Sequence, residues 1–211
     1  SSFTALDQLI RQTLANKNFP NLKGILITGF SAGGQTVQRY AAGNQVENEF
    51  PNIRFRYLVA APSSYMYLNE DRLVPGTEDR FEKPANPGCA YNTYRYGMEG
   101  LNSYMIRKTK AQMVNDYLVR DIVYTSGALD DATEKVTVSP VPYDWKDAMH
   151  LDVSCQARWQ GNSRVHRSFI FHRYVLTEFP WTKHTWFSVP GVAHEYRVYT
   201  DPRAIQAMTD F

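Results

Sequence analysis

The sequence has no long apolar run and almost no net charge. Its 211 residues contain 23 Lys and Arg against 21 Asp and Glu, giving a formal net charge of +2. This balance provides no strong field for nucleic acid or for an acidic membrane. The longest apolar stretches, near residues 24–30 and 57–62, are far shorter than the roughly 18–20 residues that cross a bilayer. We therefore expect a small-molecule partner, no nucleic acid and no membrane span.

Cysteine is scarce, and metal-binding patterns are missing from the sequence. The two cysteines, Cys89 and Cys155, form no C-x-x-C pair, and the five histidines have no ligand spacing and no H-E-x-x-H motif. We expect neither a metal nor another cofactor. The two cysteines permit one disulfide in an oxidising compartment, or two unrelated thiols in a reducing one. No N-x-S/T sequon is present to support secretion independently.

Aromatic and aliphatic residues are plentiful enough for one well-packed core. Hydrophobic residues make up 43% of the chain, which includes 11 Phe, 4 Trp and 14 Tyr, and this excludes a disordered or fibrous protein. The length suits one domain, so we expect a single domain over residues 1–211. Short apolar runs alternate with helical patterns, which predicts a doubly wound, mostly parallel α/β sheet. The predicted strands are 24–28, 53–61, 121–126 and 186–189, and the predicted helices are 6–14, 35–42, 151–179 with a break near Gly161, and 203–208.

One long segment lacks regular periodicity although it is rich in tyrosine. We expect an irregular insertion over residues 62–115, and loops of this length in a compact domain usually act as lids or binding loops. The alternative is a surface excursion whose tyrosines pack on one another. Tyr65 and Tyr67 from this segment, together with Phe30, are candidates for the walls of a substrate pocket.

A G-x-S-x-G motif, Gly29-Phe-Ser-Ala-Gly33, lies between a predicted strand and a predicted helix. In a nucleophile elbow the serine occupies a strained turn, and small residues are needed two positions to either side. Ser31 would then lie at a helix N-terminus, where the N–H of Ala32 points at a developing oxyanion. The alternative is a glycine-rich turn that binds phosphate or no ligand.

A serine nucleophile needs a base and an acid that orients the base. His194 follows the last predicted strand on a turn opened by Pro190-Gly191, where a loop would carry it to the carboxyl edge of the sheet. Asp130 follows the strand at 121–126 and is our preferred acid. The alternative acids are Asp131, Glu134 and Asp152. The remaining histidines, which we interpret as packing or surface residues, are His150, His166, His172 and His184.

Ser31, Asp130 and His194 follow separate predicted strands in the order nucleophile, acid, base that α/β-hydrolases use. The stretches ILITGFSAGGQTVQRYAAG, YLVAAPSSYMYL, LDVSCQARWQGNSR and VPGVAH resemble the α/β-hydrolase superfamily, and more narrowly a group of uncharacterised secreted hydrolases. The resemblance implies a serine hydrolase with these three residues as its triad. It also suggests that Cys89 pairs with Cys155.

The resemblance is incomplete before the motif. Hydrolases of this superfamily have several strands ahead of the elbow and take a second oxyanion N–H from an early loop, whereas thirty residues precede Ser31 here. Without those strands one edge of a parallel sheet would be exposed. We therefore expect an N-terminal companion fragment or chain that supplies the missing strands.

The leading hypothesis is a serine esterase that cleaves an ester-type acyl bond through an acyl-enzyme. Ser31 attacks the carbonyl, His194 transfers the proton, Asp130 orients His194, and the N–H of Ala32 supports the oxyanion. The alternative is a hydrolase-like scaffold that has lost catalysis and serves as a binding or structural subunit. The sequence does not choose between ester and amide, or name the substrate.

Overall fold

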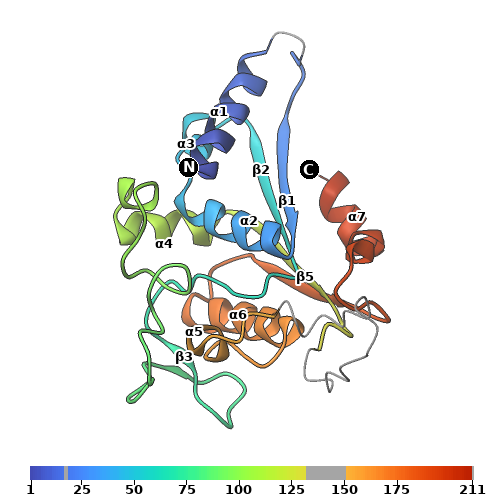
Figure 1. Cartoon of the computed structure of the whole chain (residues 1–211). Helices are drawn as coiled ribbons and strands as arrows, with labels where there is room; N and C mark the ends of the chain where they lie inside the picture. Colours follow the sequence, from blue (N-terminus) through green and yellow to red (C-terminus); the bar gives the residue numbers. More distant parts are fainter. Residues whose placement is uncertain (17–18, 132–150, 211) are drawn as a thin grey trace, which may run out of the picture.

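The computed structural model describes residues 1–16, 19–131 and 151–210 (Figure 1). Its centre is a four-stranded parallel sheet in which every strand neighbours the one before it. This confirms the expected doubly wound α/β architecture. Across the sheet the strands are β1 (Gly24–Phe30), β2 (Arg54–Ala60), β5 (Asp121–Gly127) and β6 (Thr185–Val189).

Helices cover both faces of this sheet. One face packs against α1, α2, α4 and α6, and the other packs against α7 (Figure 1). The α-helices are α1 (Ser2–Ala15), α2 (Ala32–Gly43), α3 (Val46–Glu49), α4 (Lys110–Val119), α5 (Cys155–Arg158), α6 (Arg164–Glu178) and α7 (Pro202–Thr209). Two 3-10 helices, η1 (Met105–Arg107) and η3 (Tyr196–Thr200), and a small antiparallel pair, β3 (Arg72–Leu73) and β4 (Phe81–Glu82), complete the described elements.

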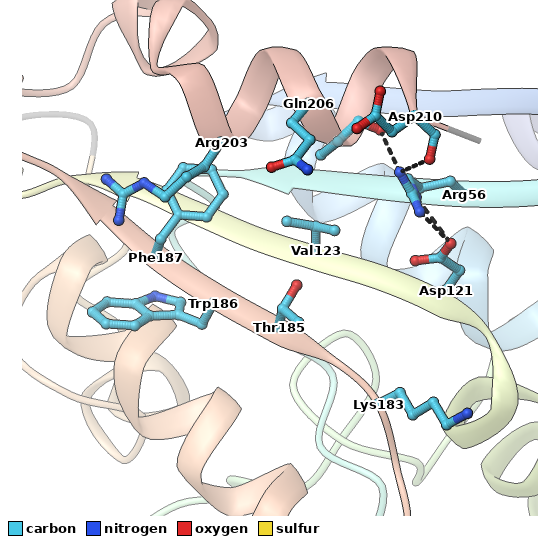
Figure 2. A pocket seen from close by; sticks show the side chains of 11 residues that line it. Arg56, Asp121, Val123, Lys183, Thr185, Trp186, Phe187, Arg203, Gln206 and Asp210 are labelled. Carbon is cyan, nitrogen blue, oxygen red and sulfur yellow. Dashed lines mark hydrogen bonds and ion pairs between the residues drawn. The ribbon is translucent and has the colours of Figure 1, made fainter.

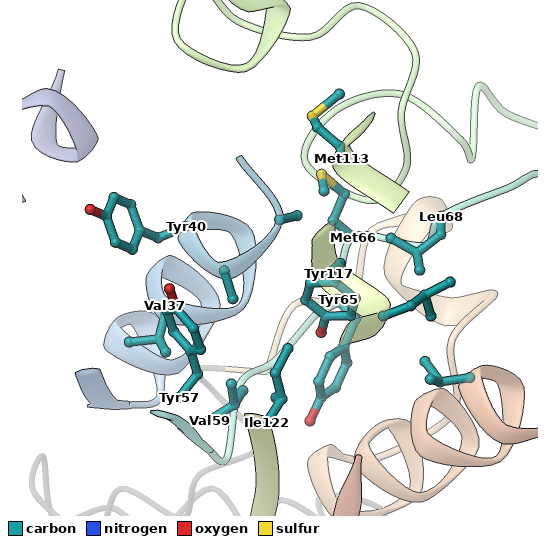
Figure 3. Packing of buried hydrophobic residues seen from close by; sticks show 14 of the residues in the cluster. Val37, Tyr40, Tyr57, Val59, Tyr65, Met66, Leu68, Met113, Tyr117 and Ile122 are labelled. Atoms are coloured by element: carbon teal, nitrogen blue, oxygen red, sulfur yellow. The ribbon is translucent and has the colours of Figure 1, made fainter. Parts of the chain in front are cut away.

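Strand β2 separates the two parts of the core. Successive side chains of a strand point to opposite faces, so Tyr57 and Val59 join the cluster under α2 and α4, whereas Leu58 and Ala60 join the cluster under α7. All four are fully buried. Figure 3 shows the first cluster, in which Tyr57 and Val59 lie between α2 and the neighbouring strand. A strand that is apolar on both faces is what a covered parallel sheet requires.

The irregular segment is shorter than expected, because α4 begins at Lys110, inside the interval 62–115. A capping box starts this helix: the Thr109 side chain accepts from the Gln112 backbone, and the Gln112 side chain accepts from the Thr109 backbone. Met113 and Tyr117 then pack into the core (Figure 3). The i, i+4 spacing of these two residues and the capping pair are the sequence signals for this helix.

A disulfide joins Cys89 in the irregular segment to Cys155 at the start of α5. The pairing suggested by the resemblance is therefore present in the structure. In the described parts of the chain, no helix combines the length and apolar character needed to cross a membrane.

A buried histidine links α4, β5 and β6 on the covered face. His184 Nε2 lies 3.0 Å from the carbonyl oxygen of Tyr117, which can only accept, so this nitrogen carries the proton. Its Nδ1 therefore accepts from the Tyr124 hydroxyl at 2.9 Å, and Tyr124 accepts in turn from Tyr117. This network requires a neutral imidazole, and burial lowers the pKa of His184 to about 4.

We expect acid to destabilise the fold through His184. Between the ordinary histidine pKa of about 6.5 and the folded value of about 4, the unfolded chain binds a proton that the folded chain does not, so stability falls as pH falls through this window. The loss approaches about 3 kcal/mol. Urea unfolding of the wild type and of His184→Gln at several pH values measures it. The variant should be less stable at pH 7 and lose less stability on acidification, and parallel pH curves for the two proteins would contradict the prediction.

Candidate active site

Three strands end at one edge of the sheet, and each is followed by one of the predicted polar residues. Ser31 comes directly after β1, Asp130 lies three residues beyond β5, and His194 lies five residues beyond β6. Because the strands are parallel, their carboxyl ends share this edge.

A chain of hydrogen bonds connects these three side chains. His194 Nδ1 lies 2.8 Å from Asp130 Oδ2, and His194 Nε2 lies 2.9 Å from Ser31 Oγ. An ionised carboxylate can only accept, so Nδ1 donates to Asp130 and leaves Nε2 as the acceptor for the serine hydroxyl. The Asp130 side chain is 1% exposed and the His194 side chain 7% exposed, so both are shielded from bulk water.

The alternative acids have other positions. Asp152 accepts from the Tyr96 hydroxyl at 2.7 Å and from the Ser154 backbone at 3.0 Å. Asp131 is exposed, and Glu134 lies outside the described residues. The structure therefore brings Asp130, and not Asp152, to His194.

The turn that presents Ser31 is strained. Its φ of 55° and ψ of −114° are rare for a residue with a side chain. The Ser31 N–H donates to the carbonyl oxygen of Ala60 on the neighbouring strand at 2.9 Å, which holds the turn against β2. Helix α2 begins at Ala32, and backbone N–H groups in the first turn of a helix have no partner within it. An anion beside Ser31 would meet these donors.

The glycines of this turn have unequal roles. A Cβ at Gly29 would lie 2.5 Å from the backbone carbon and oxygen of Gly33, and a Cβ at Gly34 would lie 2.5 Å from the carbonyl oxygen of Ala60. A Cβ at Gly33 itself would meet nothing within 4 Å. The prediction that position 33 requires a residue with little or no side chain was therefore wrong. The close approach here is between the backbone of Gly33 and the Cα of Gly29, so it restricts residue 29 and not residue 33. Gly34 was not among the predicted residues, and it needs to be glycine because the start of α2 packs against the end of β2.

A second close approach joins the loops that carry Asp130 and His194. A side chain at Gly127 would overlap the carbonyl oxygens of Val192 and Ala193. The Leu129 N–H donates to Val192 at 2.9 Å. Gly127 therefore allows the two loops to pack tightly together.

The predicted substrate-binding aromatics separate into two groups. The Phe30 ring packs on the His194 ring with centroids 4.6 Å apart, so it lies at the candidate site. Tyr65 and Tyr67 are 0% exposed. Tyr65 stacks on Phe171 of α6, and Figure 3 shows it inside the core beside Tyr117. The expectation that Tyr65 and Tyr67 line a pocket is thus corrected: both pack within the core, because the start of the irregular segment runs beneath α6.

The other histidines of the described residues form hydrogen bonds with groups other than Ser31. His172 Nε2 lies 3.1 Å from the carbonyl oxygen of His184, His184 is the buried residue described above, and His166 accepts from the Asn162 backbone. His150 lies outside the described residues. Within the described ranges, no three His, Cys, Asp or Glu side chains are grouped as metal ligands.

A cavity of about 470 Å³ lies at the opposite end of the strands, between the sheet and α7 (Figure 2). Asp121 and Thr185, the first residues of β5 and β6, line it. Arg56, which also lines it, pairs with Asp121 at 2.9 Å and donates to the Asp210 carbonyl. This cavity is therefore separate from the Ser31 site, and its paired charges serve to attach the end of α7.

Comparisons with known proteins identify the fold. No family description matches the sequence, and none of the curated proteins does. Among solved structures, LpqC, a poly(3-hydroxybutyrate) depolymerase from Bordetella parapertussis, matches 97% of this chain with a TM-score of 0.60 at 17% identity. Poly(aspartic acid) hydrolase-1 from Sphingomonas sp. KT-1 matches 98% with a TM-score of 0.57 at 18% identity. The chain spans 56% and 63% of those two chains. Its fold is of the α/β-hydrolase type, as the motifs suggested.

Alanine substitutions at the two motif glycines should have different effects on stability. We expect Gly29→Ala to lower the free energy of unfolding by about 3 kcal/mol, because the new methyl group meets rigid backbone at Gly33. Gly33→Ala meets open space, so it should be neutral or raise stability by about 0.5 kcal/mol. Denaturant unfolding of both variants measures the difference. Equal destabilisation by both substitutions would contradict the close approach of strand and helix.

Proposed function

We propose that the protein is a serine hydrolase that cleaves an ester-type acyl bond through the triad Ser31, His194 and Asp130. The observation that carries the proposal is the continuous hydrogen-bond chain from Asp130 Oδ2 through both nitrogens of His194 to Ser31 Oγ. The strained turn at Ser31 and its position at the start of α2 support the same conclusion. The fold is one on which such triads occur.

The reaction follows from the proton positions in this chain. His194 Nε2 takes the hydroxyl proton as Ser31 Oγ bonds to the substrate carbonyl carbon, and the carbonyl oxygen becomes an oxyanion. Asp130 accepts from Nδ1 and stabilises the imidazolium. The tetrahedral intermediate expels the alcohol, which takes the proton from Nε2 and leaves an acyl group on Ser31. Water then repeats the sequence, releasing the acid and restoring the serine.

The N–H of Ala32 is the first donor that we assign to the oxyanion. It belongs to the first turn of α2, where the helix dipole also favours negative charge. A tetrahedral oxyanion in this fold takes a second backbone N–H from a loop ahead of the elbow. We propose that a companion fragment or chain supplies that second donor.

We propose that the substrate is an acyl ester that carries an apolar group and binds this group next to Phe30. This ring lies against His194, so a group bound next to the reacting carbonyl would contact it. One of the two similar solved structures is a poly(3-hydroxybutyrate) depolymerase, and the other is a poly(aspartic acid) hydrolase. A short hydroxyacid ester tests the first chemistry, and an aspartyl amide tests the second.

The Cys89–Cys155 disulfide supports an oxidising compartment, and we propose secretion as the location.

The exposed edge of the sheet at β1 supports the proposal of a companion fragment or chain. Among the residues that the structure describes, strand β1 pairs on one side only, with β2, and its Thr28 is exposed while Ile25 and Leu26 are half-buried. Parallel sheets are normally covered on both faces and at their edges.

A fluorophosphonate probe tests the hydrolase proposal directly. We expect the protein to become covalently labelled, and we expect Ser31→Ala to abolish labelling because the attacking oxygen is gone. Ser188→Ala, in β6, is the matched control and should label like the wild type. Hydrolysis of a short p-nitrophenyl ester should fall by about 10³-fold or more in Ser31→Ala. A wild-type protein that neither labels nor hydrolyses the ester, with the companion present, would indicate the non-catalytic scaffold.

Native intact-mass analysis tests the companion. We expect a second polypeptide that copurifies with this chain, or one longer polypeptide containing it. In the complex or the longer polypeptide, amide hydrogen exchange along β1 should be slower than in residues 1–211 alone, because a paired strand protects its amides. Equal exchange along β1 in both forms would contradict the pairing.

A further inference from the structure

Asp130 is held from two sides, because a second charged side chain reaches the carboxylate oxygen that His194 does not use. Arg164 Nη1 lies 3.4 Å from Asp130 Oδ1, while His194 Nδ1 lies 2.8 Å from Oδ2. Both members of the Arg164–Asp130 pair are at most 1% exposed. We propose that Arg164 is a positioning residue that holds the Asp130 carboxylate oriented toward His194, an inference that rests on the proposed hydrolase function.

The start of α6 is built to make this contact. Ser163 caps the helix by accepting from the His166 backbone, and Arg164 is the first helical residue. The next residue, Val165, donates its N–H to the carbonyl oxygen of Asp130 at 3.3 Å. One helical turn therefore contacts both the side chain and the backbone of Asp130, so the position of Asp130 depends on α6 as well as on β5.

The charge of Arg164 has a specific consequence. In the described part of the chain, Arg164 and His194 are the basic side chains within 4 Å of the Asp130 carboxylate. Of these two, only the guanidinium is permanently charged. A buried carboxylate that loses its charged partner is costly, because the attraction that offsets its burial is gone. Without the guanidinium, the carboxylate would no longer be held toward Nδ1, and His194 would lose the acceptor that keeps it in the correct tautomer for Ser31.

A buried arginine in this protein does not need a carboxylate. Arg72 is 1% exposed, and its donors reach the carbonyl oxygens of Asn69, Asp71 and Tyr96. The guanidinium group also packs over the Tyr67 ring at 4.0 Å. The contact between Arg164 and Asp130 is therefore a particular arrangement at the triad, and Arg72 offers a matched control for the loss of a buried guanidinium.

The test compares Arg164→Gln, Arg164→Lys and the control Arg72→Gln. Glutamine keeps an N–H donor without the charge, whereas lysine keeps the charge. We expect Arg164→Gln to lower kcat on a short ester by about 100-fold with KM changed less than about threefold, a smaller loss than the roughly 10⁴-fold caused by losing the triad acid itself. Arg164→Lys should stay within about tenfold of the wild type, and Arg72→Gln should keep the wild-type kcat per folded molecule even if it is less stable.

A spectroscopic measurement separates this proposal from the hydrolase function. The proton between His194 Nδ1 and Asp130 should give a far-downfield proton resonance that disappears in His194→Gln. We expect the resonance to persist in Arg164→Lys and Arg72→Gln and to be lost in Arg164→Gln. A folded Arg164→Gln with wild-type kcat and an intact resonance would overturn the proposal.

Two further outcomes are decisive. If Arg164→Gln does not fold, Arg164→Lys decides the role of the charge. A folded Arg164→Lys that lacks the resonance would overturn that role, and a folded Arg164→Lys that keeps the resonance would support it. If the wild type lacks esterase activity and probe labelling, the hydrolase proposal fails, while loss of the resonance in Arg164→Gln alone still supports the positioning of Asp130.

Discussion

The register of the parallel sheet is the constraint on which the candidate site depends. Phe30 pairs with Ala60, Ala60 pairs with Thr125, and Gly127 pairs with Val189, so all four strands stop at nearly the same level. The chain then leaves the sheet at neighbouring points, and three short loops need to reach only a few residues further to meet. A shift of one residue in any strand would move its side chains to the other face and separate these loops.

Much of this arrangement follows from local sequence patterns. The apolar runs bounded by glycine and proline predicted the four strands, and the positions of Ser31, Asp130 and His194 after separate strands predicted that they would converge. The burial of Tyr65 and Tyr67 could not be predicted from local patterns, because tyrosines in a core and tyrosines in a pocket have similar neighbours in the sequence. Gly34 is needed because of how α2 packs against the sheet, and Arg164 reaches Asp130 because of how α6 packs against it. No local sequence pattern describes either packing.

Buried arginines explain how an irregular segment can lie inside the domain. A loop without regular structure leaves carbonyl groups unpaired, and burying them is costly. Arg39 donates to the Arg95 carbonyl and to Ser64, and Arg167 donates to the carbonyls of Gly161 and Ser63. Burial lowers the pKa of both arginines to about 10, which leaves them charged at neutral pH. Each guanidinium therefore pairs with two polar groups of the loops around it and holds these loops in place.

The covalent link between Cys89 and Cys155 affects where the chain can be produced. The cysteines are 66 residues apart, and closing a loop of that size restricts the unfolded chain by an amount equivalent to about 4 kcal/mol. Single domains are typically stable by only about 5–15 kcal/mol in total. A bacterial cytosol that keeps thiols reduced would thus yield a chain with a much smaller reserve against unfolding and proteolysis, whereas export to the periplasm would preserve it.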